Sequence, residues 1–260
     1  MSYGALITVR LESKRFPQKA LQKINNQSIL EIIITRLKKV ENKKNIVICT
    51  YKSKQNYLLK KIAKKHNIKI FFGSKNNILK RIIDCSQKYN FKYIFRLTGD
   101  NPYIDYKNYH KLKLLSYNYK HKEYFYSQLP LRGTRCELLK VESLRNLSRL
   151  LIDKTNVDYL TYFFFRKKLF KQKIIFSKKK YNISLTIDYK KNYYQIKSFF
   201  ENKNIQNDLN SNKLMKIVLK NKKLVRILKV KKINKIKLKT KKYDCRIIGD
   251  LKNSKIKALY

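Results

Sequence analysis

The sequence predicts an α/β fold in which a largely parallel sheet is covered by helices on both faces. Over the first hundred residues, short apolar runs typical of buried strands alternate with segments of helical apolar spacing. Such alternation favours right-handed crossovers and parallel strand pairing. In addition, 43% of the 260 residues are apolar, with 20 Tyr and 13 Phe. This composition supports a sizeable core and argues against an intrinsically disordered chain.

Four strands and three helices are expected in the first half of the chain. The strands are expected at 5–9, 46–48, 68–72 and 93–97, and the helices at 29–40, 58–63 and 78–89. Ligands of open parallel sheets bind beyond the carboxyl ends of the strands. The loops after Val9, Thr50, Phe72 and Leu97 are therefore predicted to line one crevice.

The pattern is looser in the second half of the chain. Helices are expected near 109–115, at 141–151, at 158–165 and through 194–199, and strands near 124, at 173–176 and at 184–187. Residues 213–242 contain many Lys and no acidic residue. The simplest division is one folded domain at 1–212 followed by a basic C-terminal extension at 213–260.

The chain carries 64 basic and 16 acidic side chains, a formal net charge of +48. Charge of this size attracts polyanions, nucleic acids included. Two explanations stay open: an A/T-biased codon pool that favours Lys on the solvated surface, or a surface selected to face a polyanion. The segment 213–242 has no Phe or Trp for stacking on bases. Nucleic-acid binding is therefore the weaker alternative.

The cysteine and histidine positions bear on the cellular compartment. The four Cys and three His are scattered, without the spacing of a zinc site or a disulfide framework, which favours a reducing compartment. The apolar run Ala5–Val9 is too short for a signal peptide or a membrane span. We expect a cytoplasmic protein without a membrane span.

A cationic loop follows the first predicted strand. Within ten residues it carries Arg10, Ser13, Lys14, Arg15 and Lys19. A loop of this kind between a strand and a helix can wrap a polyphosphate, with side chains neutralising charge and loop amides donating hydrogen bonds. It lacks the glycines of the common phosphate-binding loops. A solvated basic loop is the alternative.

Two predicted strands end in an aspartate, Asp100 after 93–97 and Asp188 after 184–187. Carboxylates at such strand ends can hold Mg²⁺, which keeps most of its waters and bridges to substrate phosphates. A turn or a helix cap is the alternative role for Asp100. Two carboxylates facing a cationic loop favour a metal-dependent reaction at phosphorus.

Five motifs in order support a more specific interpretation. They are Arg10, Ser13, Arg15, Pro17 and Lys19; Gly73-Ser74 with Leu79 and Arg81; Arg96-x-Thr98-Gly99-Asp100-x-Pro102; Gly133 with Glu137; and Thr186-x-Asp188. Together, from about Ala5 to Phe200, they resemble the cytidylyltransferases of the spore coat polysaccharide biosynthesis protein F type. These are relatives of the enzymes that make CMP-Kdo and CMP-sialic acid.

The resemblance implies a Rossmann-like, three-layer nucleotidyltransferase fold of the glycosyltransferase-A type, with a mostly parallel mixed sheet. It also implies CTP as substrate, Mg²⁺ as cofactor and a sugar or sugar acid as acceptor, for surface polysaccharide biosynthesis. The acceptor hydroxyl would attack the α-phosphorus and release pyrophosphate. Because relatives of this fold are commonly dimers, a homodimer is one assembly to consider.

The resemblance also implies a role for individual residues. Those that would bind the nucleotide are Arg10, Ser13, Arg15, Lys19, Gly73, Ser74, Arg81, Thr98 and Gly99. Lys19, Asp100 and Asp188 would be catalytic, with the two aspartates holding Mg²⁺. Glu137 and Asp158 would bind the acceptor, with a structural salt bridge as the alternative for each. Three tyrosines could face the sugar or pack in the core, namely Tyr103, Tyr124 and Tyr126.

The sequence departs from the family pattern at several positions. Val9 replaces the usual Ala, Gln18 replaces Gly, and Asn77 and Asn192 stand where acidic residues are usual. The segment 158–161 lacks a His that could contact the acceptor. These departures leave open a second hypothesis, a relative that binds nucleotide without catalysis.

Overall fold

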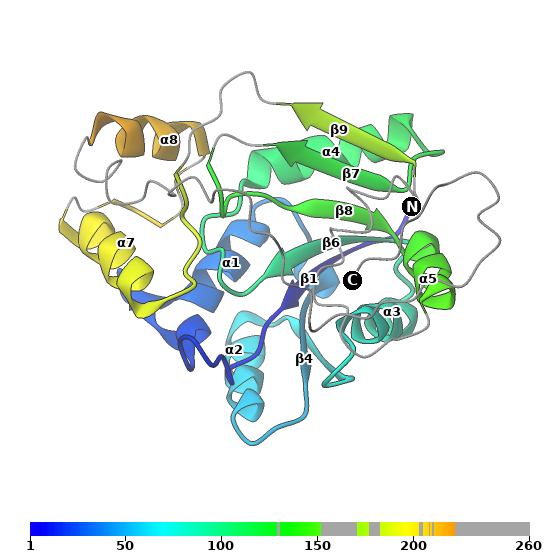
Figure 1. Cartoon of the computed structure of the whole chain (residues 1–260), viewed down its shortest axis with the longest axis horizontal. Helices are drawn as coiled ribbons and strands as arrows, with labels where there is room; N and C mark the ends of the chain where they lie inside the picture. The colour runs from blue at the N-terminus through cyan, green and yellow to red at the C-terminus, as the bar shows by residue number, and fades with distance from the viewer. Residues whose placement is uncertain are drawn as a thin grey trace, which may run out of the picture.

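A seven-stranded sheet forms the centre of the computed structural model, in the order β5-β4-β1-β6-β8-β7-β9 (Figure 1). The structure describes residues 1–128, 131–151, 171–176, 183–202, 205–207, 209 and 211–221. The strands are β1 (Tyr3–Thr8), β4 (Ile46–Tyr51), β5 (Lys69–Gly73), β6 (Tyr93–Thr98), β7 (Tyr124–Gln128), β8 (Glu137–Lys140) and β9 (Gln172–Phe176). Within this sheet only β8 runs antiparallel to its neighbours. The predicted mostly parallel α/β fold is confirmed.

Helices connect the strands in the predicted alternation. They are α1 (Ile29–Leu37), α2 (Leu59–His66), α3 (Ile78–Lys88), α4 (Tyr106–Asn118), α5 (Val141–Leu150), α7 (Lys190–Asn202) and α8 (Ser211–Lys220). A short hairpin of β2 (Lys23–Ile24) and β3 (Gln27–Ser28) precedes α1. Its turn residues Asn25 and Asn26 have φ of 47° and 62°, a conformation that Asn tolerates in two-residue hairpin turns. No helix in the described part of the chain is long and apolar enough to cross a membrane.

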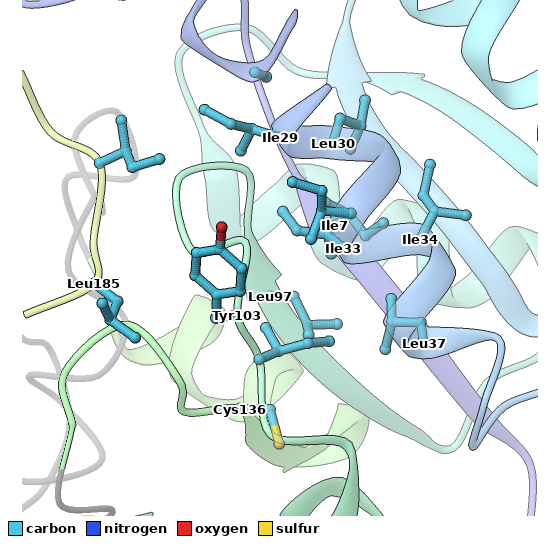
Figure 2. Packing of buried hydrophobic residues seen from close by; sticks show 14 of the residues in the cluster. Ile7, Ile29, Leu30, Ile33, Ile34, Leu37, Leu97, Tyr103, Cys136 and Leu185 are labelled. Atoms are coloured by element: carbon cyan, nitrogen blue, oxygen red, sulfur yellow. The ribbon is translucent and has the colours of Figure 1, made fainter. Parts of the chain in front are cut away.

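The sheet separates two apolar clusters because successive strand residues point to opposite faces. Ile7 packs in the larger cluster with α1, α4, α7 and α8, whereas its neighbour Leu6 packs in the second with α3 and α5. Figure 2 shows Ile29, Ile33 and Leu37 of α1 in the larger cluster with Ile7. Helices on both faces leave the carboxyl ends of the central strands as the place where loops can gather.

Helix α1 begins with a capping box. The Ser28 hydroxyl accepts a hydrogen bond from the Glu31 amide at 3.2 Å, and the Glu31 carboxylate accepts one from the Ser28 amide at 2.9 Å. The Glu31 carboxylate also contacts Lys65 of α2 at 2.6 Å. One acidic residue therefore fixes the start of α1 and joins it to α2.

Three expectations for the second half need comment. The strand predicted at 184–187 is wrong, because within the described part of the chain this segment makes only an isolated bridge between Ser184 and Arg132. The helix predicted at 158–165 lies outside the described residues. The boundary predicted at 212/213 falls inside α8, whose Leu214 and Val218 are buried in the larger cluster.

Candidate active site

A cavity of about 350 Å³ lies where β1 and β6 end. Eight of the residues predicted for the site line it, namely Arg10, Ser13, Arg15, Lys19, Arg81, Thr98, Gly99 and Asp100. The structure adds Thr8, Val9, Ala20, Lys75, Asn76, Ile78 and Arg96. The loops after β1, β5 and β6 thus form the predicted crevice, as expected for parallel strands. The loop after β4, which was also predicted to line it, contributes none of the lining residues.

Buried anchors shape the loop after β1. Leu11 is fully buried and Phe16 is nearly so. The amide of Leu11 donates to the Asn56 side chain at 2.9 Å, and the amide of Gln18 donates to the Leu11 carbonyl at 2.8 Å. Gln18 has a φ of 52°, which explains why glycine suits this position in the family. The apolar anchors leave the cationic side chains to face the cavity.

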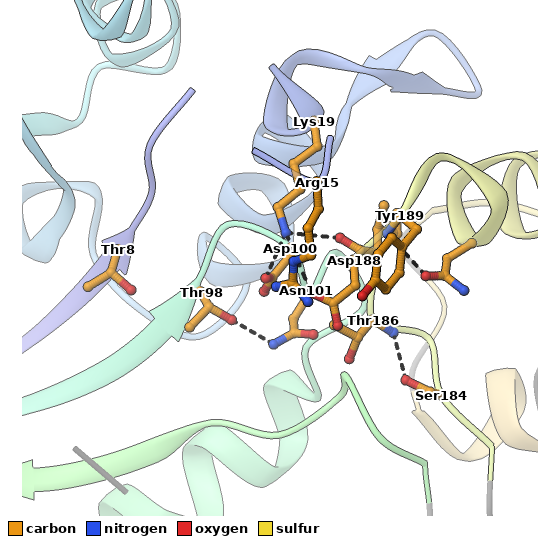
Figure 3. A network of polar contacts seen from close by, with 12 residues as sticks. Thr8, Arg15, Lys19, Thr98, Asp100, Asn101, Ser184, Thr186, Asp188 and Tyr189 are labelled. Carbon is orange, nitrogen blue, oxygen red and sulfur yellow. Dashed lines mark hydrogen bonds and ion pairs between the residues drawn. The ribbon is translucent and has the colours of Figure 1, made fainter. Parts of the chain in front are cut away.

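The two aspartates come together through a backbone hydrogen bond. The amide of Ile187 donates to the carbonyl of Asp100 at 2.9 Å, which places Asp188 beside the end of β6. Lys19 joins both: its Nζ lies 2.9 Å from Asp100 Oδ2, 3.0 Å from the Ile187 carbonyl and 4.0 Å from Asp188 Oδ1. Figure 3 shows this convergence of three segments distant in sequence.

Arg15 forms the outer contact of this cluster. Its guanidinium lies 2.8 Å from Asp188 Oδ1, and its side chain is 54% exposed, against 11% for Lys19. A hydrogen bond to Tyr189 and the attraction of Asp188 raise the pKa of the Arg15 guanidinium. Two cations therefore face two carboxylates, and their formal charges cancel.

Gly133 holds the segment that carries Asp188. The Arg132 amide donates to the Ile183 carbonyl, and its carbonyl accepts from the Leu185 amide. Gly133 has a φ of +82°, and a Cβ there would lie 2.7 Å from the Thr186 amide nitrogen. Only glycine allows this close backbone approach.

Gly73 and Ser74 do not line the cavity but support Arg81. The Arg81 guanidinium donates to the carbonyls of Ser74 and Lys75 at 2.7 and 3.0 Å. A Cβ on Gly73 would lie 2.7 Å from Arg81 Cγ. Arg81 therefore shapes the loop that brings Lys75 and Asn76 to the cavity.

Glu137, predicted to bind the acceptor, pairs with Arg96. Their side chains lie 3.1 Å apart, each 13% exposed, on residues paired across β6 and β8. This is the structural salt bridge that the sequence left as an alternative. Asp158 lies outside the described residues. All three tyrosines considered as sugar-facing rings are buried in the core, namely Tyr103, Tyr124 and Tyr126.

Asn192 caps the helix that follows Asp188. Its Oδ1 accepts a hydrogen bond from the Tyr189 amide at 3.1 Å, where α7 begins. An acidic side chain can accept the same bond, so the replacement by Asn preserves this local structure. The position therefore has a structural role in this chain.

Three of the lining residues were not predicted from the sequence, namely Lys75, Asn76 and Ile78. In a chain so rich in Lys and Asn, the first two carry no signal of their own, and Ile78 resembles any helical core residue. Arg96 had a detectable signal, since it begins the motif that contains Asp100 and ends in Pro102.

Comparisons with known proteins bear on this site. A sequence model for the family described as cytidylyltransferase matches residues 5–236. The spore coat polysaccharide biosynthesis protein SpsF of Bacillus subtilis is 23% identical over 225 residues, which cover 83% of this chain and 93% of that protein. The uncharacterised protein MJ1063 of Methanocaldococcus jannaschii is 33% identical over 102 residues, 39% of this chain and 42% of that protein.

Solved structures show the same fold. A cytidylyltransferase from Leptospira borgpetersenii serovar Hardjo-bovis (strain JB197) superposes with a TM-score of 0.79 at 27% identity, over 90% of this chain and 99% of that one. A CMP:2-keto-3-deoxy-manno-octonic acid synthetase complexed with CTP gives a TM-score of 0.61 at 11% identity, over 78% of this chain and 100% of that one. The second likeness concerns the fold alone.

Proposed function

The chain belongs to the cytidylyltransferase family of nucleotidyltransferases, and we propose that it transfers CMP from CTP to a sugar or sugar acid and releases pyrophosphate. The observation that carries this proposal is the convergence of Lys19, Asp100 and Asp188 beside a cavity lined by the cationic loop. The name of the SpsF relative supports a role for the product in surface polysaccharide synthesis.

Arg10, Arg15 and Lys19 would neutralise and orient the triphosphate of CTP. Ser13 and the loop amides add hydrogen-bond donors. Catalysis of phosphoryl and nucleotidyl transfer depends mainly on positioning and on neutralising phosphate charge. The acceptor hydroxyl oxygen forms a bond to the α-phosphorus while the bond from that phosphorus to the α,β-bridging oxygen breaks. Pyrophosphate leaves with the electron pair, and the hydroxyl proton passes to solvent.

The donor set fits Mg²⁺. Asp100 and Asp188 offer carboxylate oxygens within 4.0 Å of one point, the Lys19 ammonium, and hard oxygen donors are what Mg²⁺ prefers. Asp100 and Asp188 would hold the ion. Its chemistry there would be to neutralise phosphate charge and orient the triphosphate.

Turnover of CTP tests the proposal. Pyrophosphate release is measured with CTP and a panel of sugars and sugar acids, at about 0.2 M salt to suppress non-specific attraction of nucleotides. We expect turnover with CTP, and a fall of about 100-fold or more in Asp100→Asn and Lys19→Ala. The exposed Lys23, outside the cavity, gives the matched control Lys23→Ala, which should keep parental activity.

Two results would contradict the proposal. One is equal binding of CTP, UTP, ATP and GTP that vanishes with salt, which would leave a merely basic surface. The other is full turnover in both Asp100→Asn and Lys19→Ala. Tight, selective CTP binding without pyrophosphate release from any acceptor would favour the non-catalytic hypothesis instead.

A further inference from the structure

The Lys19 ammonium occupies the point between the two carboxylates where a metal ion would be expected. Three oxygens from two segments surround Nζ, two at 2.9 and 3.0 Å and one at 4.0 Å. Oxygen atoms converging on one positive centre are the hallmark of a cation site. In this structure the cation is a side chain of the protein itself.

Burial makes this arrangement consequential. The Lys19 side chain is 11% exposed and that of Asp100 is 23% exposed, so solvent screens their interaction less than it screens an ion pair on the open surface. Arg15 lies on Asp188 at 2.8 Å and completes the neutralisation. A divalent cation that arrives alone would face two cations already in place.

A divalent cation that binds without nucleotide would also leave the Lys19 ammonium without its oxygen partners. Displaced from Asp100, Asp188 and the Ile187 carbonyl, the Lys19 ammonium would lose three oxygen contacts. An uncompensated, largely buried charge is costly. A triphosphate removes this cost, because its oxygens can accept hydrogen bonds from the ammonium. Its negative charge also exceeds the positive charge of the metal ion.

We propose that Lys19 is a displaceable internal counter-ion that makes metal binding conditional on the triphosphate. Without ligand, Lys19 keeps the carboxylate pair neutral and assembled. It releases the pair only when a divalent cation and a triphosphate are both present. This inference rests on the proposed function, and adds to it an obligatory coupling between metal and nucleotide binding.

The test measures binding of Mn²⁺ alone to the full chain by electron paramagnetic resonance of the free ion, at about 0.2 M salt. We expect weak binding to the parent protein and at least about tenfold tighter binding to Lys19→Met, which removes the charge and keeps most of the side-chain length. Lys23→Met removes the same charge from an exposed site four residues away. It should stay within about twofold of the parent, because long-range repulsion is screened at this ionic strength.

Further variants test whether the gain in Mn²⁺ affinity arises at the carboxylate pair. Lys19→Gln replaces Lys19→Met if the latter fails to fold, since the Gln side-chain amide is uncharged but can still donate a hydrogen bond to Asp100. Adding Asp100→Asn to Lys19→Met should abolish the gain in Mn²⁺ affinity. In the parent, protein and CTP together should bind more Mn²⁺ than the sum of what each binds alone, since CTP itself chelates the ion. Mn²⁺ should tighten CTP binding by the same coupling factor.

The inference is overturned if Lys19→Met binds Mn²⁺ no more tightly than Lys23→Met, or if the gain survives the Asp100→Asn change. Because the first readout needs no nucleotide and no turnover, the two failures are distinguishable. If Lys19→Met gains Mn²⁺ affinity but the parent turns over no acceptor, the counter-ion role stands and the proposed function is contradicted. If the parent turns over an acceptor but Lys19→Met gains no Mn²⁺ affinity, the proposed function stands and the counter-ion role is contradicted.

Discussion

At the level of single residues, Gly99 and Val9 are fitted to each other at the rim of the cavity. Gly99 donates its amide to the Thr8 carbonyl at 3.0 Å, and a Cβ on Gly99 would lie 2.6 Å from Val9 Cγ2. The family usually has Ala at position 9. The larger Val9 side chain therefore uses the space that Gly99 leaves.

We predict that Gly99→Ala lowers the free energy of unfolding by about 1–3 kcal/mol, because the added methyl overpacks against Val9. Adding Val9→Ala should recover part of the loss, because it removes Cγ2 but keeps Val9 Cβ, which would lie 2.8 Å from the added methyl. The coupling free energy from urea unfolding of the two single variants and the double variant should reach about 1 kcal/mol. Additive losses would contradict a direct contact.

A second prediction at this scale concerns Glu137. If its role is the pairing with Arg96, Glu137→Gln should lower the free energy of unfolding by about 2 kcal/mol, because a largely buried guanidinium loses its counter-charge. Urea denaturation measures this loss. Asp84→Asn, which breaks the exposed pair with Lys80, should cost less than about 1 kcal/mol. A Glu137 variant of parental stability with a raised KM for the acceptor would restore its predicted binding role.

The sequence predicts the positions of some of these residues but not their partners. The position of Asp100 at the cavity was predictable, because its Gly-Asp-Asn-Pro turn directly follows a buried strand. The partner of Glu137 was not, because the register that places it opposite Arg96 arises only when β8 pairs with β6. No local pattern encodes that register.

At the level of elements, the start of α1 depends on one acidic residue. Burial acts to raise the pKa of Glu31, but hydrogen bonds from Lys65 and Ser28 outweigh it and lower the pKa from 4.5 to about 2. A lowered pKa in the folded state stabilises the fold fully above pH 4.5. That stabilisation is lost as the pH falls from 4.5 toward 2.

We predict that Glu31→Gln lowers the free energy of unfolding at pH 7 by about 2 kcal/mol. The gap between parent and variant should narrow below pH 4.5, as the parental carboxylate loses its advantage. Urea unfolding at pH 7, 5, 4 and 3 measures this difference in the free energy of unfolding. Glu142, 49% exposed on α5, provides the control Glu142→Gln, which should change little at any of these pH values. A gap that stays constant with pH would contradict the role of the Glu31 charge.

The element-scale prediction that failed has a physical reason. Ile183, Leu185 and Ile187 are all buried, and this alternation is the pattern of a half-buried strand. Among the described residues, however, its backbone hydrogen bonds go to Arg132 and Asp100 and not to a neighbouring strand. Hydrophobic alternation reports burial of one face and not the presence of a hydrogen-bonded neighbour. By contrast, the strands and helices of the first hundred residues were predictable, because each combines a long apolar pattern with a polar loop.

At the level of the whole molecule, the charge of +48 should oppose folding through self-repulsion. We predict that raising the ionic strength from about 0.02 M to 0.2 M increases the Tm by about 3 °C or more, since screening weakens that repulsion. Differential scanning fluorimetry measures the shift.

The choice of salt provides the control: chloride and sulfate salts should raise the Tm equally at equal ionic strength. A shift that saturates at low sulfate concentration would instead indicate anion binding in the cationic cavity.

The span of the contacts around Lys19 has a consequence for how the protein is made. Lys19 contacts Asp100, 81 positions later, and Ile187, 168 positions later. During synthesis the parallel strands can pair as soon as β6 has left the ribosome, yet the carboxylate cluster is incomplete until residue 188 follows. Contacts so distant in sequence also form late in folding, because long loops must close first. A nascent or truncated chain that ends before Asp188 is therefore expected to have a sheet but no working centre.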